Sequence, residues 1–249
     1  SPESAYGYVT HAITMGAVMR NYAAAYDYGR LALEVNRRFD DLRSRAKINH
    51  MFSCYIGFWC RPIAESFTYS QAAYKTGIES GDYVYAAYGC FHESWHALFS
   101  GMNLQRFQKD YSEKLGFLER TGNESFRDAH QLMLQWGKGL QGQTQARGDL
   151  DGIPFDETIY LSRYRQAEFF VAFHHIAKLH LLYLFGDYAG AHEMARKAKS
   201  VALGIRGMIW DAWLCLYDGL TLTAWAIEKG GVSQREKDRL RDSIELMGL

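Results

Sequence analysis

Apolar residues recur at helical spacing, every third or fourth position, along almost the whole chain, while the alternation typical of strands is scarce. Only three prolines interrupt this pattern, Pro2, Pro62 and Pro154. Proline is rare inside helices because it cannot donate the backbone hydrogen bond that a helix needs. The pattern therefore predicts an all-α chain.

Two distant segments share one pattern of small residues. "NYAAAYDYGRLA", from Asn21, and "DYAGAHEMARKA", from Asp187, both have a small polar residue, a tyrosine, and alanines three and ten positions after that tyrosine. Small side chains at these spacings let one helix pack closely against another. Ile63 and Leu104 occupy equivalent places, so the anchors fall at 22, 63, 104 and 188, in steps of 41, 41 and 84.

A second marker keeps the same period. Asp41, Asp82 and Asn123 are 41 residues apart, and Asp and Asn are favourable residues at a helix N-cap. Antiparallel helix pairs at this spacing predict a right-handed, tetratricopeptide-like solenoid of about six hairpins, whose first helices line a concave face. After a helix that ends near 140 we expect a glycine-rich loop over 141–154, then helices over 155–162, 164–185, 188–204 and 208–229 and from 233.

Composition narrows the class of protein. Lys plus Arg equals Asp plus Glu, 28 each, so no overall charge favours nucleic acid or an anionic membrane. The most apolar stretch, 167–185, carries too many polar groups for a lipid-facing span. Four isolated cysteines indicate reduced thiols and a cytoplasmic protein. The chain starts without methionine and stops inside a helical pattern, so we expect one domain, 1–249, cut from a longer protein.

Several long segments resemble a known class of repeat. "SPESAYGYVTHAITMG", "SGDYVYAAYGC", "WHALFSGMNL" and "LLYLFGDYAGAHEMARKA" are similar to the helical-repeat region of large bacterial signalling proteins, which join a serine/threonine kinase-like domain, a STAND-type AAA ATPase and often GAF and histidine kinase domains. "MIWDAWLCLYDGLTLTAWAIEKGG" matches only in general character. The chain holds no GxxxxGK[ST] motif and no kinase catalytic loop. The resemblance therefore implies a non-enzymatic regulatory module, whose partners are a protein or peptide, flanking kinase or ATPase domains, or a small effector.

Repeat phase predicts which side chains face the concave groove. His92 and His96 lie 12 and 8 residues before the Leu104 anchor, and the same count places other polar and aromatic residues at equivalent positions. We expect no catalytic residue, cofactor or metal among them. The predicted partner-binding groove consists of Thr14, Met51, Tyr55, His92, Trp95, His96, Phe99, His180 and Tyr183.

"HESWH", residues 92–96, allows a different interpretation. Zinc peptidases carry HExxH on a helix, where both imidazoles bind one metal and the glutamate activates its water. The required third ligand is missing from the sequence after His96, and Glu113 and Glu119 are expected on the partner helix. The groove is therefore favoured. A zinc-dependent hydrolase using His92, Glu93 and His96 and a purely structural spacer between catalytic domains stay as alternatives.

Overall fold

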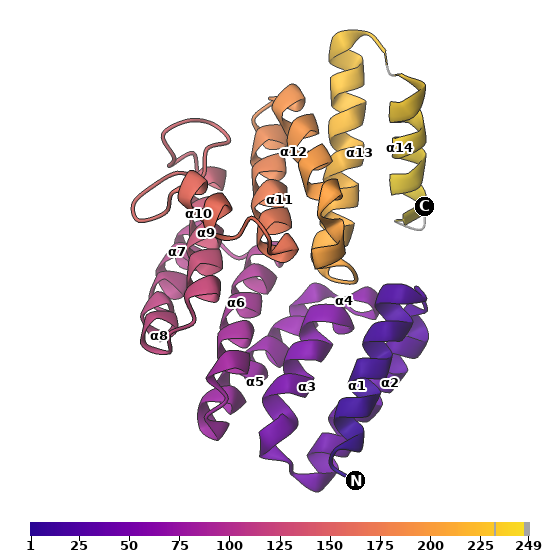
Figure 1. Ribbon diagram of the computed structural model, residues 1–249, viewed down its shortest axis with the longest axis vertical. Helices are drawn as coiled ribbons and strands as arrows, with labels where there is room; N and C mark the ends of the chain where they lie inside the picture. The colour runs from indigo at the N-terminus through magenta and orange to yellow at the C-terminus, as the bar shows by residue number, and fades with distance from the viewer. Residues whose placement is uncertain (232, 247–249) are drawn as a thin grey trace. The chain divides into compact units, whose positions relative to one another are not determined.

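The computed structural model describes residues 1–231 and 233–246, and every extended regular element within them is helical (Figure 1). The predicted all-α class is confirmed. The helices are α1 (Ser4–Ile13), a π-helical turn (Thr14–Val18), α2 (Tyr22–Phe39), α3 (Leu42–Tyr55), α4 (Gly57–Cys60), α5 (Ile63–Ser80), α6 (Tyr83–Phe99), α7 (Leu104–Ser112), α8 (Leu115–Arg120), α9 (Glu124–Leu140), α10 (Glu157–Arg163), α11 (Glu168–Leu184), α12 (Tyr188–Ser200), a 3₁₀ turn (Ala202–Ile205), α13 (Ile209–Lys229) and α14 (Gln234–Leu246).

The contacts divide the chain into two units, one covering Ser1–Leu134 and one starting at Gln135. The single domain expected over 1–249 stays a prediction, and its residues 232 and 247–249 lie outside the described part of the chain.

Side-chain caps decide where many of these helices begin. The Asp41 carboxylate accepts a hydrogen bond from the Arg43 amide at the start of α3, and Asp82 accepts one from the Tyr85 amide at the start of α6. Such caps satisfy backbone amides that have no partner inside the helix. The predicted N-caps Asp41 and Asp82 are confirmed, and Asn123, the third, directly precedes α9. The predicted anchors are also helix starts: α2, α5, α7 and α12 begin at Tyr22, Ile63, Leu104 and Tyr188.

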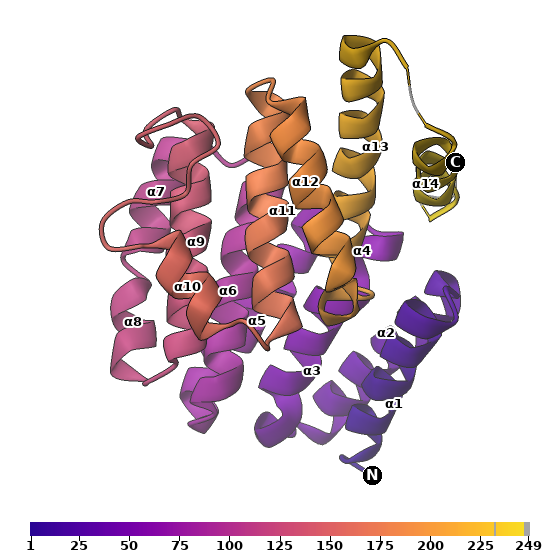
Figure 2. The ribbon, with the colours of Figure 1, turned by 45° about the horizontal axis from the view of Figure 1, so that its top comes forward.

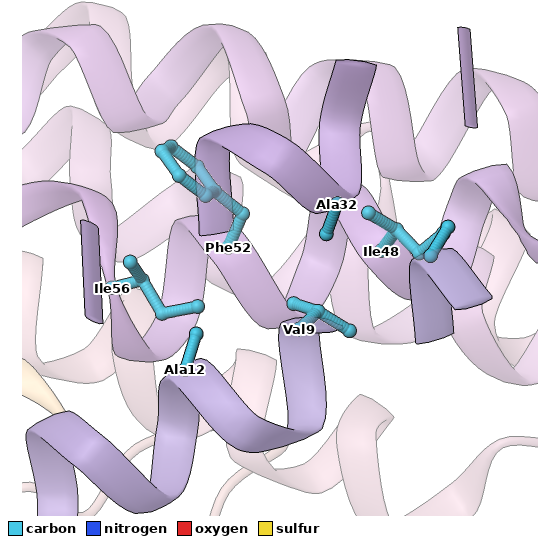
Figure 3. Close-up of a cluster of buried hydrophobic side chains, with 7 residues drawn as sticks. Val9, Ala12, Ala32, Ile48, Phe52 and Ile56 are labelled. Atoms are coloured by element: carbon cyan, nitrogen blue, oxygen red, sulfur yellow. The ribbon is translucent and has the colours of Figure 1, made fainter. Parts of the chain in front are cut away.

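In the first unit, successive long helices pack in a regular order. α1 packs on α2 and α3, α3 packs on α5 and α6, and α5 packs on α6 (Figure 1). Between α1, α2 and α3 lies an apolar core, and Figure 3 shows its side chains converging from the three helices. Burial of each large apolar side chain contributes roughly 1.5–3 kcal/mol. The labelled members of this core are Val9, Ala12, Ala32, Ile48, Phe52 and Ile56.

Two glycines bring α5 and α6 into close contact. A Cβ at Gly89 would lie 2.5 Å from the Tyr74 backbone nitrogen, and one at Gly77 would lie 2.7 Å from the Ala86 nitrogen. Small residues at a helix crossing let the two backbones approach. This contact fixes α6, the helix that carries HESWH, against its neighbour.

In the second unit, α10 packs on α11, α11 on α12 and α13, α12 on α13, and α13 on α14 (Figure 2). Residues 141–154 form turns and irregular structure, as expected. The helix expected over 164–185 begins later, at Glu168, because the Ala167 amide closes a turn onto the Tyr164 carbonyl. The breaks that produce the short helices α4 and α8 in the first unit were not predicted. Among the described helices, none combines the length and the apolar character needed to cross a membrane.

Candidate functional site

The side chains of HESWH enter the interior of the first unit. α6 packs against α3 and α5, so most of its surface is covered. His92 is 2% exposed, and Trp95 and His96 are 0% exposed. A ligand could touch these three residues only by displacing protein atoms.

His92 is the middle of a buried hydrogen-bonded chain. The Trp95 indole N–H donates to His92 Nδ1. A neutral imidazole carries one proton, so with Nδ1 acting as acceptor the proton lies on Nε2. That nitrogen is 3.5 Å from the Cys54 sulfur, which therefore accepts from it. Burial holds the pKa of His92 well below its usual value and raises the pKa of the Cys54 thiol, so all three groups are neutral.

His50 joins His92 and Cys54 to form the one buried cluster of metal-ligand residue types that the described residues contain. His50 and Cys54 lie one turn apart on α3, and the ligand atoms of the three side chains are all within 4.8 Å of one another. His50 Nδ1 is buried without a hydrogen-bond partner, and burial lowers the His50 pKa to about 3. The 3.5 Å between His92 Nε2 and the Cys54 sulfur is close to the roughly 3.6 Å edge of a tetrahedral zinc site.

The hydrogen bonding of His92 nevertheless does not fit a metal ligand. A histidine that binds a metal through one nitrogen normally donates the N–H of the other to an acceptor. Here Nδ1 faces the Trp95 N–H, which is itself a donor, and Nε2 carries the proton. Metal binding would require the buried indole to turn away. The cluster fits a structural hydrogen-bond chain better than a metal centre.

The remaining HESWH side chains point to other neighbours. Glu93 pairs with the Lys114 ammonium and accepts a hydrogen bond from the Tyr111 hydroxyl at 3.4 Å. His96 Nδ1 lies 2.6 Å from the Ser70 hydroxyl on α5, and burial lowers the His96 pKa to about 3. Within the described residues, His92, Glu93 and His96 are not gathered around one point as a zinc peptidase requires.

The other groove residues of the first unit are more accessible. Met51 and Tyr55 are half-buried and pack against the core between α1, α2 and α3. Phe99 is half-buried, with its ring centroid 5.9 Å from that of Trp95. Thr14 is exposed, and its hydroxyl donates to the Thr10 carbonyl. Binding by these residues stays a prediction.

In the second unit, His180 and Tyr183 belong to one aromatic cluster. The Trp136 indole N–H donates to His180 Nδ1 at 3.2 Å, and the Tyr217 ring centroid is 4.4 Å from that of His180. Tyr217 also lies 5.4 Å from Tyr183, and Trp213 lies 5.4 Å from His180. His180 is buried, whereas Tyr183, Trp213 and Tyr217 are half-buried. The structure therefore brings together two predicted residues and adds aromatic neighbours.

Sequence reasoning missed His50, Cys54, Trp213 and Tyr217. Each pair is spaced by four residues in the sequence, which places both members on one helix face. This spacing was the available signal. The count back from each repeat anchor selects only the residues 12 and 8 positions before it, and neither pair lies at those positions.

Comparisons of the chain with protein-family models, with curated proteins and with solved structures found no match.

Proposed function

We propose that this chain is a non-enzymatic interaction module whose second unit binds a peptide segment through half-buried aromatic rings. The observation that carries the proposal is the cluster formed by Tyr183 on α11 with Trp213 and Tyr217 on α13. Aromatic side chains offer large apolar contact area at small entropic cost, and Tyr and Trp add a polar tip for hydrogen bonding. Such rings are the most frequent anchors of protein interfaces.

The proposal includes a right-handed, tetratricopeptide-like solenoid with a period of about 41 residues. In this arrangement α11 and α13 are first helices of successive hairpins, and their shared face is concave. Two facts support it. α11 packs on both α12 and α13, and helices start at Tyr22, Ile63 and Leu104 and at Leu42, Tyr83 and Glu124, each series in steps of 41.

The biological role in this proposal is regulation of a kinase or ATPase in the same polypeptide, in a bacterial signalling protein. A peptide that binds one curvature of the helical array more tightly shifts the array toward that curvature. The flanking domain responds if its own states prefer different curvatures. Sequencing the gene on both sides of the segment that encodes this chain tests the role directly. An ATPase or kinase domain in the same reading frame would support it, and a reading frame that encodes no such domain would contradict it.

Peptide binding is tested by selecting binders from a displayed random peptide library on the immobilised chain. The Kd of a selected peptide is then measured for the unchanged chain and for two variants. Tyr183→Ala removes a ring from the cluster, and we expect Kd to rise by about tenfold, a typical loss for an interface aromatic. Tyr26→Ala is the matched control, because Tyr26 is also half-buried but lies on α2, in the first unit. Equal effects of the two substitutions, or no selectable peptide, would contradict the proposal and favour a structural spacer.

A further inference from the structure

A polar cavity of about 600 Å³ lies between α12 and α14 of the second unit. This volume is in the range of small-molecule sites. Cationic side chains line it from both helices: Arg196 and Lys199 from α12, and Arg239 from α14. Glu236 is the one carboxylate among its described lining residues. The lining is therefore positively charged.

A buried carboxylate holds two of these cations in place. Asp218 on α13 is 0% exposed, and its oxygens lie 2.5 Å from Lys199 Nζ and 3.0 Å from Arg239 Nε. Ion pairs with a fixed, buried partner restrict two long side chains that would otherwise be mobile. The ammonium and guanidinium groups are thus ordered at the cavity wall before any ligand arrives, which reduces the entropic cost of binding.

A net positive charge remains after the ion pairs are counted. Lys199 and Arg239 share the single carboxylate of Asp218, and Glu236 is paired with Lys229. The Glu236 carboxylate accepts hydrogen bonds from Lys229 Nζ at 2.8 Å and from the Ser233 amide at 2.6 Å. The Lys229 ammonium and the Ser233 donors lower the pKa of Glu236 to about 2. The carboxylate is therefore ionised and bound to its own helix start.

Arg196 offers hydrogen-bonding capacity to a ligand. The Arg196 side chain is 62% exposed, and its Nε lies 3.6 Å from the nearest Glu193 oxygen, which makes a loose ion pair. Glu193 also pairs with Lys197. His192 lines the same cavity. Burial lowers the pKa of His192, so its ring is neutral and adds no charge to the lining.

We propose that this cavity binds the phosphate group of a soluble phosphate monoester. A phosphate monoester carries close to two negative charges and three acceptor oxygens, which complement cations presented from two helices. The planar guanidinium of arginine matches two phosphate oxygens at once, and lysine adds a point charge. The cavity is much larger than a phosphate ion, so the ligand has an organic part as well.

The test uses isothermal titration calorimetry on the whole chain with AMP, and with adenosine as the uncharged counterpart. We expect saturable binding of AMP and none of adenosine. Arg196→Gln should raise the Kd for AMP by about tenfold, the usual effect of losing a charge-assisted hydrogen bond. Lys197→Gln is the matched control: the two residues are adjacent, both pair with Glu193, and only Arg196 lines the cavity.

Three results would overturn the proposal. The first is that binding does not saturate at about 10 mM AMP, which would mean an affinity too weak to be useful. The others are equal effects of the two substitutions, which would indicate general charge attraction, and equal binding of AMP and adenosine. The Arg196 and Lys197 side chains are 62% and 48% exposed, so we expect unchanged unfolding temperatures, which would exclude loss of folding as an explanation. Tyr183→Ala should leave AMP binding intact, so failure of this site and failure of the proposed peptide site are distinguishable.

Discussion

Gly89→Ala tests the contact that positions HESWH. The added Cβ would lie 2.5 Å from the Tyr74 backbone nitrogen and 2.9 Å from the Ser70 carbonyl oxygen, where ordinary contact begins near 3.4 Å. Both atoms belong to the backbone of α5, so α5 and α6 must separate by about 0.9 Å. Overpacking of this kind costs about 1–3 kcal/mol, and the better helix propensity of alanine returns about 1 kcal/mol. The difference is a net loss of up to about 2 kcal/mol, and we expect the upper end because rigid backbone must move.

The measurement is urea unfolding followed by circular dichroism, with Gly7→Ala as the control. Gly7 lies inside α1 and a Cβ there meets no atom within 4 Å, so this variant gains helix propensity alone and should be more stable by about 0.4–1 kcal/mol. The two substitutions are chemically identical and should have opposite signs. If Gly89→Ala is as stable as Gly7→Ala, the close crossing of α5 and α6 is refuted, and with it the burial of His92 and His96.

Three further predictions concern the buried polar groups. His96→Ala should lower the free energy of unfolding by roughly 2–3 kcal/mol, since it leaves the Ser70 hydroxyl without its imidazole partner and opens a cavity; unchanged thermal unfolding would instead make His96 a surface residue. Stability should fall between pH 6.5 and about 4, because burial lowers the pKa of His180 and of His130 to about 4 while the unfolded chain binds those protons near 6.5; equal urea midpoints at pH 7 and pH 5 would contradict this. Protein purified without a histidine tag should hold less than about a tenth of an equivalent of zinc by mass spectrometry of metals, and binding near one equivalent would refute the assignment of the His92 proton to Nε2.

Helix starts could be predicted from the sequence because they depend on local chemistry. A side chain such as Asp82 reaches backbone amides only three residues away, so its role follows from its immediate neighbours. The break after Tyr55 that produces α4 could not be predicted in the same way. A Cβ at Gly57 would lie 2.9 Å from the Ser66 hydroxyl oxygen and 3.1 Å from the Phe52 ring. This crowding exists only once α3 and α5 have come together.

The candidate site was predicted less well because helix face depends on packing partners. The count from Leu104 assigns His92 and His96 to one surface, but these residues contact different helices, α3 through Cys54 and α5 through Ser70. A side chain four residues away is on the same face only approximately, since four residues of an α-helix turn through about 40° more than one full turn. That difference is enough to direct two imidazoles to different neighbours in a closely packed layer.

The same arrangement of indole and imidazole occurs in both units, and it explains why His92 and His180 occupy buried positions. Trp95 donates to Nδ1 of His92 in the first unit, and Trp136 donates to Nδ1 of His180 in the second. Both histidines are held neutral by burial, and each satisfies an indole N–H that would otherwise cost free energy in the interior. A leucine in place of either histidine would remove the acceptor of this hydrogen bond, so interior hydrogen bonding alone accounts for the polar residue. In the second unit, the side chains that a partner can reach are therefore the half-buried rings beside His180, such as Tyr183 and Tyr217, rather than the imidazole itself.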